Sequence, residues 1–214
     1  MSDEPGEAPG RYLREGAALE FDRVSFFSDA VYAIAMTLLV VELHVPDVAT
    51  AALWPAIRDE WYGIFGFFLG FLLLGRYWLA HHRFFGSLKS IDQRMVAVNL
   101  VYLALVAFCP FPIGLISAYE AAPSAFFVFA AVMAGISTLE AVLFWMAVRG
   151  GHLRRRMRPA TVRFGLTAAL LPVGVMLASL PIALWSTTAA LLSWMAAIPI
   201  NLWMERRTPG DLVG

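Results

Sequence analysis

Six apolar stretches long enough to cross a lipid bilayer are the feature that most limits the fold of this chain. A transmembrane helix needs about 20 mostly apolar residues. Segments of this kind run over residues 23–44, 61–82, 95–119, 124–148, 162–181 and 184–204. The chain is 60% hydrophobic and 15% charged, whereas a soluble domain is about 25% charged. The sequence therefore predicts an all-α integral membrane protein with six transmembrane helices.

Lysine and arginine residues gather on one side of the predicted helices. They lie before the first span, after the sixth, and in the loops after the second and fourth spans, whereas the first loop offers only Arg58. Cytoplasmic loops carry the excess of Lys and Arg, so both termini are expected to be cytoplasmic. The expected organisation is an N-terminal cytoplasmic tail (1–22), a six-helix transmembrane domain (23–204) and a C-terminal cytoplasmic tail (205–214).

The first span has two different faces. At 3.6 residues per turn, Ser28 and Asp29 share one face, and Ile34, Leu38 and Val41 share the opposite face. Thr37 borders this apolar stripe. A carboxylate is costly in hydrocarbon, so the polar face is expected to meet neighbouring helices. The pattern alone leaves three partners open for the apolar stripe: lipid, another helix or a pore.

Further polar groups within the spans cluster toward the same, cytoplasmic side. They are His81, His82, Asp92, Asn99, Arg76 and Glu140. We expect them to share hydrogen bonds that hold the bundle together, with Arg76 and Glu140 as candidates for an ion pair inside the membrane. A histidine in such a network could also couple cytoplasmic pH to helix packing.

Several classes of function lack support in the sequence. It has no nucleophile elbow, metalloprotease motif or phosphate-binding loop, so an enzyme is not expected. Because His81 and His82 are adjacent, they point to different faces of a helix, and neither a metal site nor a cofactor is expected. A net charge of zero gives no field that would attract nucleic acid. The expected surroundings are membrane lipids.

The run Arg23-x-x-x-Phe27-Ser28-Asp29, followed by Ala33-Ile34-Ala35-Met36-Thr37-Leu38-Leu39, resembles the first helix of the transmembrane protein 175 family of potassium channels. The resemblance extends to His81, His82, Asp92, Asn99 and the Pro110-Phe111 stretch. Animal members hold two six-helix repeats, whereas this chain holds one set. It therefore resembles a prokaryotic member of the family.

The resemblance implies a homotetramer in which the first helices line a central pore. Ile34, Leu38 and Val41 fall on the pore-facing hydrophobic positions, and Thr37 matches a threonine next to the constriction. Other motif residues would tie the first three helices together on the cytoplasmic side. This network would comprise Arg23, Phe27, Ser28, Asp29, His81, His82, Asp92 and Asn99.

The expected function is passive conduction of monovalent cations, with a weak preference for potassium, across the inner (plasma) membrane of a prokaryote. The potassium ion would be the permeant species, not a cofactor. Two other functions stay open at this point. One is a proton-coupled secondary transporter that uses Asp29, Glu140 and the histidines. The other is a membrane scaffold that transports nothing and uses the apolar stripe as a packing seam.

Overall fold

The computed structural model describes residues 9–119 and 122–195, and it is helical apart from loops and one isolated β-bridge. The helices α1 to α8 and two short 3-10 helices follow one another along the chain. They are α1 (Pro9–Leu38), η1 (Leu39–Glu42), η2 (Thr50–Ala52), α2 (Leu53–Asp59), α3 (Trp61–Gly86), α4 (Gln93–Phe108), α5 (Pro110–Ala118), α6 (Pro123–Gly150), α7 (Pro159–Ala183) and α8 (Thr187–Met195).

Five membrane-capable helices occur in the described part of the chain. They cover Phe21–Glu42, Trp61–Gly86, Gln93–Ala118, Pro123–Gly150 and Pro159–Ala183. These helices confirm the first five predicted spans, and their ends fall close to the predicted ones. Helix α8 covers only the first part of the predicted sixth span. The rest of that span and the predicted tail at 205–214 lie outside the described residues.

Prolines and one glycine set several helix boundaries. The third span divides into α4 and α5 at Cys109, because Pro110 has no N–H to continue the helix. Pro123 and Pro159 occupy the first turns of α6 and α7, where a missing N–H costs nothing. Gly151 ends α6 with φ of 67°, a left-handed conformation that glycine adopts without strain.

Helix α1 begins much earlier than the sequence suggested. The expected N-terminal tail ended at residue 22, but α1 starts at Pro9 and continues without a break through Arg23. The segment between these points is rich in Arg, Leu, Glu and Ala, which favour helix. The membrane-capable part of this helix begins at Phe21, close to the predicted Arg23, because hydropathy marks where a helix becomes apolar and not where it begins.

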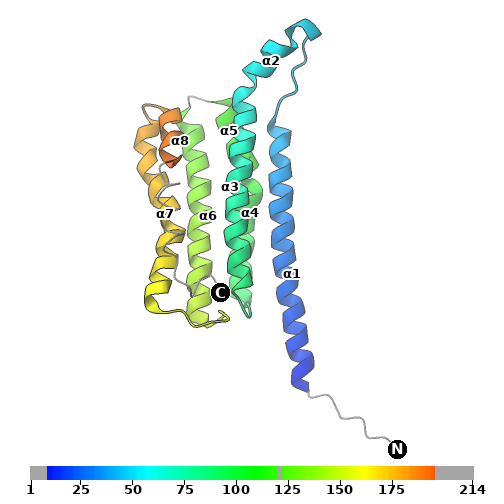
Figure 1. Ribbon diagram of the computed structural model, residues 1–214, viewed down its shortest axis with the longest axis vertical. Helices are drawn as coiled ribbons and strands as arrows, with labels where there is room; N and C mark the ends of the chain where they lie inside the picture. Colours follow the sequence, from blue (N-terminus) through cyan, green and yellow to red (C-terminus); the bar gives the residue numbers. More distant parts are fainter. Residues whose placement is uncertain (1–8, 120–121, 196–214) are drawn as a thin grey trace, which may run out of the picture.

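Helix α1 stands at one edge of the bundle (Figure 1). It packs against α3 and α4, while α6 packs against α4, α5 and α7, and α8 packs against α7. The main core includes Tyr32 of α1, Leu74 of α3, Tyr102 of α4 and Ile136 of α6, all fully buried. Only one face of α1 is therefore buried by the described helices of its own chain.

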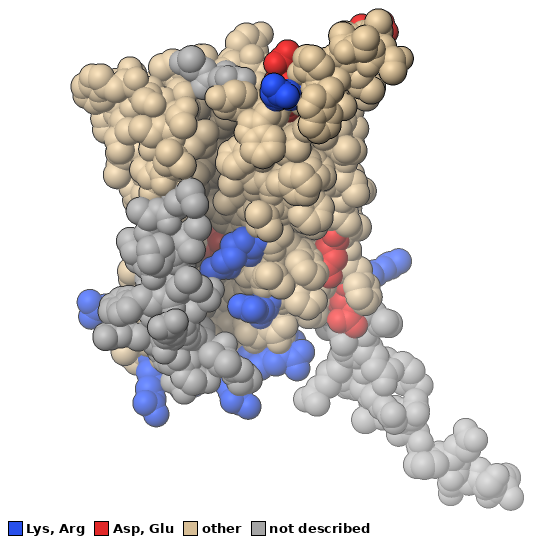
Figure 2. All heavy atoms as spheres, turned by 45° about the horizontal axis from the view of Figure 1, so that its top comes forward, with Lys and Arg blue, Asp and Glu red and all other residues tan. Residues whose placement is uncertain are grey.

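The two ends of the bundle differ in charge. Figure 2 shows most lysine and arginine side chains toward the lower end and a single patch of basic atoms at the upper end, whereas acidic side chains appear in both halves. The loops at the lower end, residues 87–92 and 151–158, join α3 to α4 and α6 to α7. The charge asymmetry noted in the sequence is thus a property of the folded molecule.

Candidate functional site

The outward face of α1 carries a continuous apolar stripe. Ile34 is 58% exposed, Leu38 44% and Val41 71%. The opposite face is buried in the bundle, and its residues recur every three or four positions, as one side of a helix requires. These buried residues are Ser28, Tyr32, Ala35 and Leu39. The predicted division of this helix into two faces is thus present, and the described residues leave the stripe exposed.

Two further residues lie along the stripe. The exposed hydroxyl of Thr37 donates a hydrogen bond to the carbonyl of Ile34 at 2.8 Å, which leaves oxygen lone pairs available to an ion or water. Phe27 is 52% exposed and lies two turns before Ile34 on the same face. The structure therefore does not bring Phe27 into the polar network that was expected to include it.

A buried chain of hydrogen bonds joins α1, α4 and α3. The side-chain amide of Asn99 donates to Ser28 Oγ at 3.0 Å, and Asn99 Oδ1 lies 2.9 Å from His81 Nε2. Ser28 Oγ in turn donates to the carbonyl of Val24 at 2.8 Å. Because the amide oxygen can only accept, His81 must carry its proton on Nε2 in this arrangement. Ser28, Asn99 and His81 are all buried, so each polar group has a partner away from water.

Aromatic side chains enclose this chain of hydrogen bonds. The imidazole of His81 stacks on Phe85 at 4.3 Å and on Tyr102 at 5.2 Å between ring centroids. The hydroxyl of Tyr102 is hydrogen-bonded to that of Tyr32 on α1. Sequence reasoning did not identify this tyrosine pair. The available signal was that a buried tyrosine hydroxyl needs a partner.

Asp29 belongs to a second, half-buried cluster. Its Oδ1 accepts a hydrogen bond from the indole N–H of Trp78 at 2.8 Å, and His82 Nδ1 lies 3.7 Å from the same oxygen. The Trp78 indole and the His82 imidazole also lie close together on α3, with 5.4 Å between their ring centroids. The structure thus places the expected Asp29 and His82 together, and it adds Trp78, which sequence reasoning missed.

Asp92 and Arg23 lie outside both clusters. Asp92 caps α4, because its Oδ1 accepts the backbone N–H of Met95 at 2.8 Å. This hydrogen bond and the nearby His152 hold the pKa of Asp92 below its usual value. The Asp92 Oδ2 atom is 3.5 Å from His152 Nε2, a partner that the sequence did not indicate. The side chain of Arg23 is exposed.

The remaining pair of predicted residues lies at a similar depth on α3 and α6. Glu140 is half-buried and interacts electrostatically with Arg76. Neighbouring hydroxyls are already bonded to each other, since Tyr77 and Ser137 are 2.7 Å apart. Within the described residues, no group of three His, Cys, Asp or Glu side chains could hold a metal ion.

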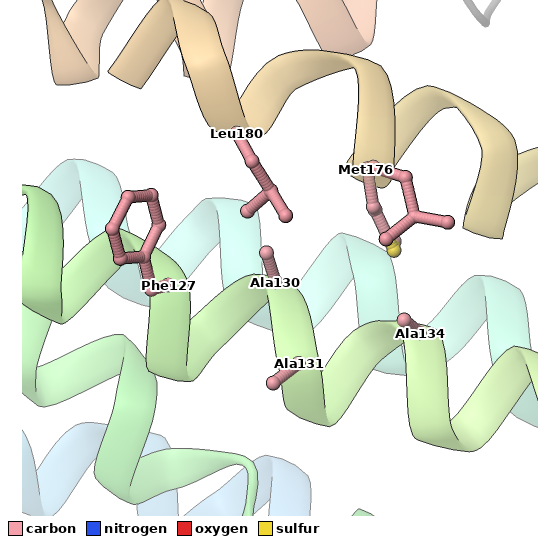
Figure 3. Close-up of a pocket in the computed structure, with 7 residues that line it drawn as sticks. Phe127, Ala130, Ala131, Ala134, Met176 and Leu180 are labelled. Carbon is pink, nitrogen blue, oxygen red and sulfur yellow. The ribbon is translucent and has the colours of Figure 1, made fainter. Parts of the chain in front are cut away.

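Helices α6 and α7 enclose a small apolar cavity (Figure 3). Alanines of α6 lie opposite larger side chains of α7. The labelled residues are Phe127, Ala130, Ala131, Ala134, Met176 and Leu180. Every one of these side chains is apolar, so the cavity offers no charged group or hydroxyl to an ion. The polar chemistry of the spans is concentrated around α1, α3 and α4 instead.

Comparison with known proteins places these observations in a family. Residues 23–110 match the family model described as endosomal/lysosomal potassium channel TMEM175. A potassium channel of Streptomyces collinus is 32% identical over 73% of this chain and 81% of its own length. A potassium channel of Chamaesiphon minutus is 38% identical over 58% of this chain and 63% of its own length.

A solved structure extends the similarity to the fold. It is the crystal structure of a lysosomal potassium-selective channel TMEM175 homologue from Chamaesiphon minutus. The TM-score is 0.72 at 27% identity, over 88% of this chain and 98% of the other. These relatives are channels, not enzymes, in agreement with the absence of enzyme motifs. The resemblance of the first helix to this family is confirmed, and the chain is a multi-pass membrane protein that belongs to the TMEM175 family.

Proposed function

We propose that four copies of this chain form a potassium channel in which α1 lines a central pore. The observation that carries the proposal is the exposed stripe on α1. Ile34, Leu38 and Val41 are 58%, 44% and 71% exposed, although α1 has a well-packed opposite face. Four such stripes around a common axis would bury one another and leave a narrow apolar passage. The relatives named as potassium channels support an ion as the species that passes.

The constriction would consist of three stacked rings, from Ile34, Leu38 and Val41. Hydrophobic constrictions restrict conduction by dewetting, so low conductance is expected. The weak preference for potassium is what the resemblance to prokaryotic members of the family implies. The resemblance places leucine at the third position in many relatives, and valine at position 41 would widen the outer ring here. Thr37 hydroxyls, between the Ile34 ring and the Leu38 ring, would offset part of the cost of removing water from the ion.

Charges at the two ends support an orientation. The basic loops at the lower end would face the cytoplasm, together with both termini, in the inner membrane of a prokaryote. At the opposite end, a pocket beside the last turn of α1 is lined by Glu42, Asp59 and Glu60. Negative side chains near a pore mouth raise the local concentration of cations. This arrangement favours the passage of cations over anions.

The hydrogen-bonded residues behind α1 would hold the pore-lining helix in place. Asn99 and Trp78 reach α1 from α4 and α3 through Ser28 and Asp29. This role is structural: the polar face of α1 points into the bundle, away from the stripe. Glu140 and Arg76 would act in the same way, as an ion pair that ties α6 to α3.

Potassium flux into proteoliposomes tests the pore assignment. The Leu38→Ala and Ile34→Asn variants are expected to raise the flux several-fold, because each makes the apolar constriction wider or more polar. Leu177→Ala is the matched control, since Leu177 is 59% exposed on α7, far from α1 (Figure 1). Unchanged flux in both α1 variants would contradict the assignment.

The assembly is tested separately by the mass of the protein in detergent. Four copies of a 23.6 kDa chain are expected after the detergent contribution is subtracted. Introducing a charge with Ile34→Lys should lower this mass, because the stripes would no longer bury one another without leaving a charge in an apolar contact. A monomer or dimer as the largest wild-type species would contradict the tetramer.

A proton-coupled transporter is the alternative that the sequence left open. It requires a proton relay from Asp29 through the histidines to Glu140. Asp29 lies beside His82 but is bonded to Trp78, and His81 is bonded to Asn99. Neither tryptophan nor asparagine relays a proton. Saturable flux that depends on a co-substrate would support this alternative, whereas flux linear in potassium concentration would support the channel.

A further inference from the structure

The two loops at the basic end of the bundle are joined by backbone hydrogen bonds. The N–H of Lys89 donates to the carbonyl of His152 at 2.8 Å, and the N–H of Arg154 donates to the carbonyl of Ser87 at 2.9 Å. Between them, Leu88 and Leu153 form an antiparallel β-bridge. The α3–α4 loop and the α6–α7 loop therefore move as one unit while these bonds are intact.

Side chains reinforce this junction from both sides. Arg154 Nε donates to the carbonyl of Leu88 at 2.9 Å. Leu88 and Leu153 are 0% and 8% exposed and belong to the main core. The junction thus combines buried apolar side chains with paired backbone groups, which is the usual requirement for a persistent contact between loops.

The imidazole of His152 lies between two residues of the other loop. Its Nδ1 is 3.0 Å from Ser90 Oγ, and its Nε2 is 3.5 Å from Asp92 Oδ2. The His152 side chain is only 16% exposed. It lies directly over Gly150, where an added Cβ would come within 2.4 Å of the ring. The ring thus lies between Gly150, the last residue of α6, and Asp92, the capping residue of α4.

We propose that His152 is a proton-sensitive latch that fastens the α6–α7 loop to the N-terminus of α4. When the ring is protonated, it carries a positive charge next to the Asp92 carboxylate, and both ring nitrogens donate. When it is neutral, the charge attraction is lost and only the hydrogen-bonding geometry remains. Histidine is the side chain whose charge ordinarily changes between pH 5 and 8, so the latch would tighten as the pH falls through this range.

The other charged groups at this junction do not replace Asp92. Lys89 and Arg154 meet the junction through backbone N–H groups, and the Arg154 guanidinium is bonded to a carbonyl. Arg149 stacks on Trp145 at 4.9 Å, and Arg94 lies in the first turn of α4 beside Asp92. The Asp92 pKa is below its usual value because the Met95 N–H binds the carboxylate. Asp92 therefore keeps its charge throughout the range in which a histidine titrates.

The latch has a direct route to α1. Asp92 caps α4, and α4 carries Asn99, which binds Ser28 of α1. Loosening the latch would free the first turn of α4 and weaken the helix that holds α1. Any effect on conduction rests on the proposed channel function, whereas the latch itself is a property of the loops.

Hydrogen exchange on the full-length protein in nanodiscs tests the latch. The Lys89 and Arg154 amides should be about two- to fivefold better protected at pH 5.5 than at pH 7.5, after correction for intrinsic exchange, as for a partly exposed ion pair. His152→Gln and Asp92→Asn should abolish this difference, and Asn keeps the helix cap. His44→Gln, at the other end of the bundle near Glu60, is the control and should leave it intact. Equal protection at both pH values in wild type, or an unchanged difference in His152→Gln, would overturn the proposal.

Flux measurements separate the latch from the channel. If the latch acts on conduction, potassium flux should depend on pH between 5.5 and 7.5 in wild type and lose part of this dependence in His152→Gln. The same pH dependence in both would overturn regulation by the latch. An absence of flux in every variant would contradict the proposed channel, while the exchange data would still decide the latch.

Discussion

The side-chain amide of Asn99 on α4 donates a hydrogen bond to Ser28 Oγ on α1 at 3.0 Å. The same amide also reaches His81 on α3 through its oxygen, at 2.9 Å. A single residue therefore connects three membrane-spanning helices. Because all three side chains are buried, replacing the amide would leave His81 Nε2 without its partner and Ser28 Oγ with only the bond that it donates to the Val24 carbonyl.

Asn99→Leu, which is close in volume, is expected to destabilise the protein by about 1–2 kcal/mol, because His81 loses its buried partner and Ser28 loses the donor to its oxygen. This corresponds to a fall in melting temperature of roughly 2–8 °C in detergent. Thr138→Ala is a suitable control, since the exposed Thr138 hydroxyl bonds only within its own helix, to Ala134. Equal melting temperatures for Asn99→Leu and wild type would show that this hydrogen-bond chain contributes little to stability.

Trp78→Phe should show how much the indole N–H contributes to the cluster at Asp29. The change keeps an aromatic ring but removes the N–H that Asp29 accepts at 2.8 Å. His82 Nδ1, at 3.7 Å from the same oxygen, is too distant to replace this hydrogen bond. The variant should therefore be less stable than wild type by about 1 kcal/mol.

Melting curves of wild type and Trp78→Phe supply the measurement. Equal melting temperatures for the two proteins would contradict a stabilising contribution from the indole N–H.

The sequence predicted the spans and the two faces of α1 because both depend on local patterns. Apolar length identifies a transmembrane helix, and the helical period separates Ile34 from Ser28. Partners from distant helices were not predictable in the same way. Trp78 is 49 residues from Asp29, and His152 follows Asp92 only after α4, α5 and α6. Pairing at such separations depends on how the helices pack against each other, and the local sequence pattern does not predict this packing.

Phe27 shows a different kind of limit. The family resemblance assigned it to the cytoplasmic-side network, whereas the helical period places it on the same face as Ile34, and its side chain is 52% exposed on the apolar stripe. Neighbours in sequence point in different directions on a helix, so membership of a motif does not imply a shared contact. The helical period is the better guide to the surroundings of each motif residue.

Thr37→Val tests the effect of the Thr37 hydroxyl on flux without changing the volume of the side chain. Valine keeps the shape but removes the oxygen that borders the apolar stripe, so potassium flux in proteoliposomes is expected to fall several-fold. Thr37→Ser keeps the hydroxyl and should retain most of the flux. The hydroxyl already donates to Ile34 at 2.8 Å, and only its lone pairs can serve an ion. Equal flux in the valine and serine variants would argue against any contribution from this oxygen.

Asp92 should stabilise α4 in a pH-dependent way. Asp92→Ala is expected to cost about 1 kcal/mol, as for the loss of a helix cap, whereas Asp92→Asn should keep the cap and lose only the stabilisation that comes from the charge. The Asp92 pKa is below its ordinary value, so the ionised carboxylate favours the folded state. This contribution is present above the ordinary aspartate pKa of about 4 and is lost as the pH falls through the lower pKa of the folded protein. Melting curves between pH 3 and 7 should show the gap between wild type and Asp92→Asn closing at the acid end.

Gly70→Ala and Gly75→Ala, two identical changes on α3, should have opposite effects. A Cβ at Gly70 would lie 2.7 Å from Ile113 Cδ1 and 3.3 Å from Leu39, where α5 and η1 pack closely on α3. Overpacking of this kind costs about 1–3 kcal/mol. A Cβ at Gly75 meets nothing within 4 Å, so alanine there should be neutral or stabilise by up to about 1 kcal/mol through its helix propensity. Because Leu39 directly follows Leu38, Gly70→Ala should also alter potassium flux, while Gly75→Ala should not. Equal melting temperatures for the two variants would show that α5 and η1 can move away from α3 at little cost.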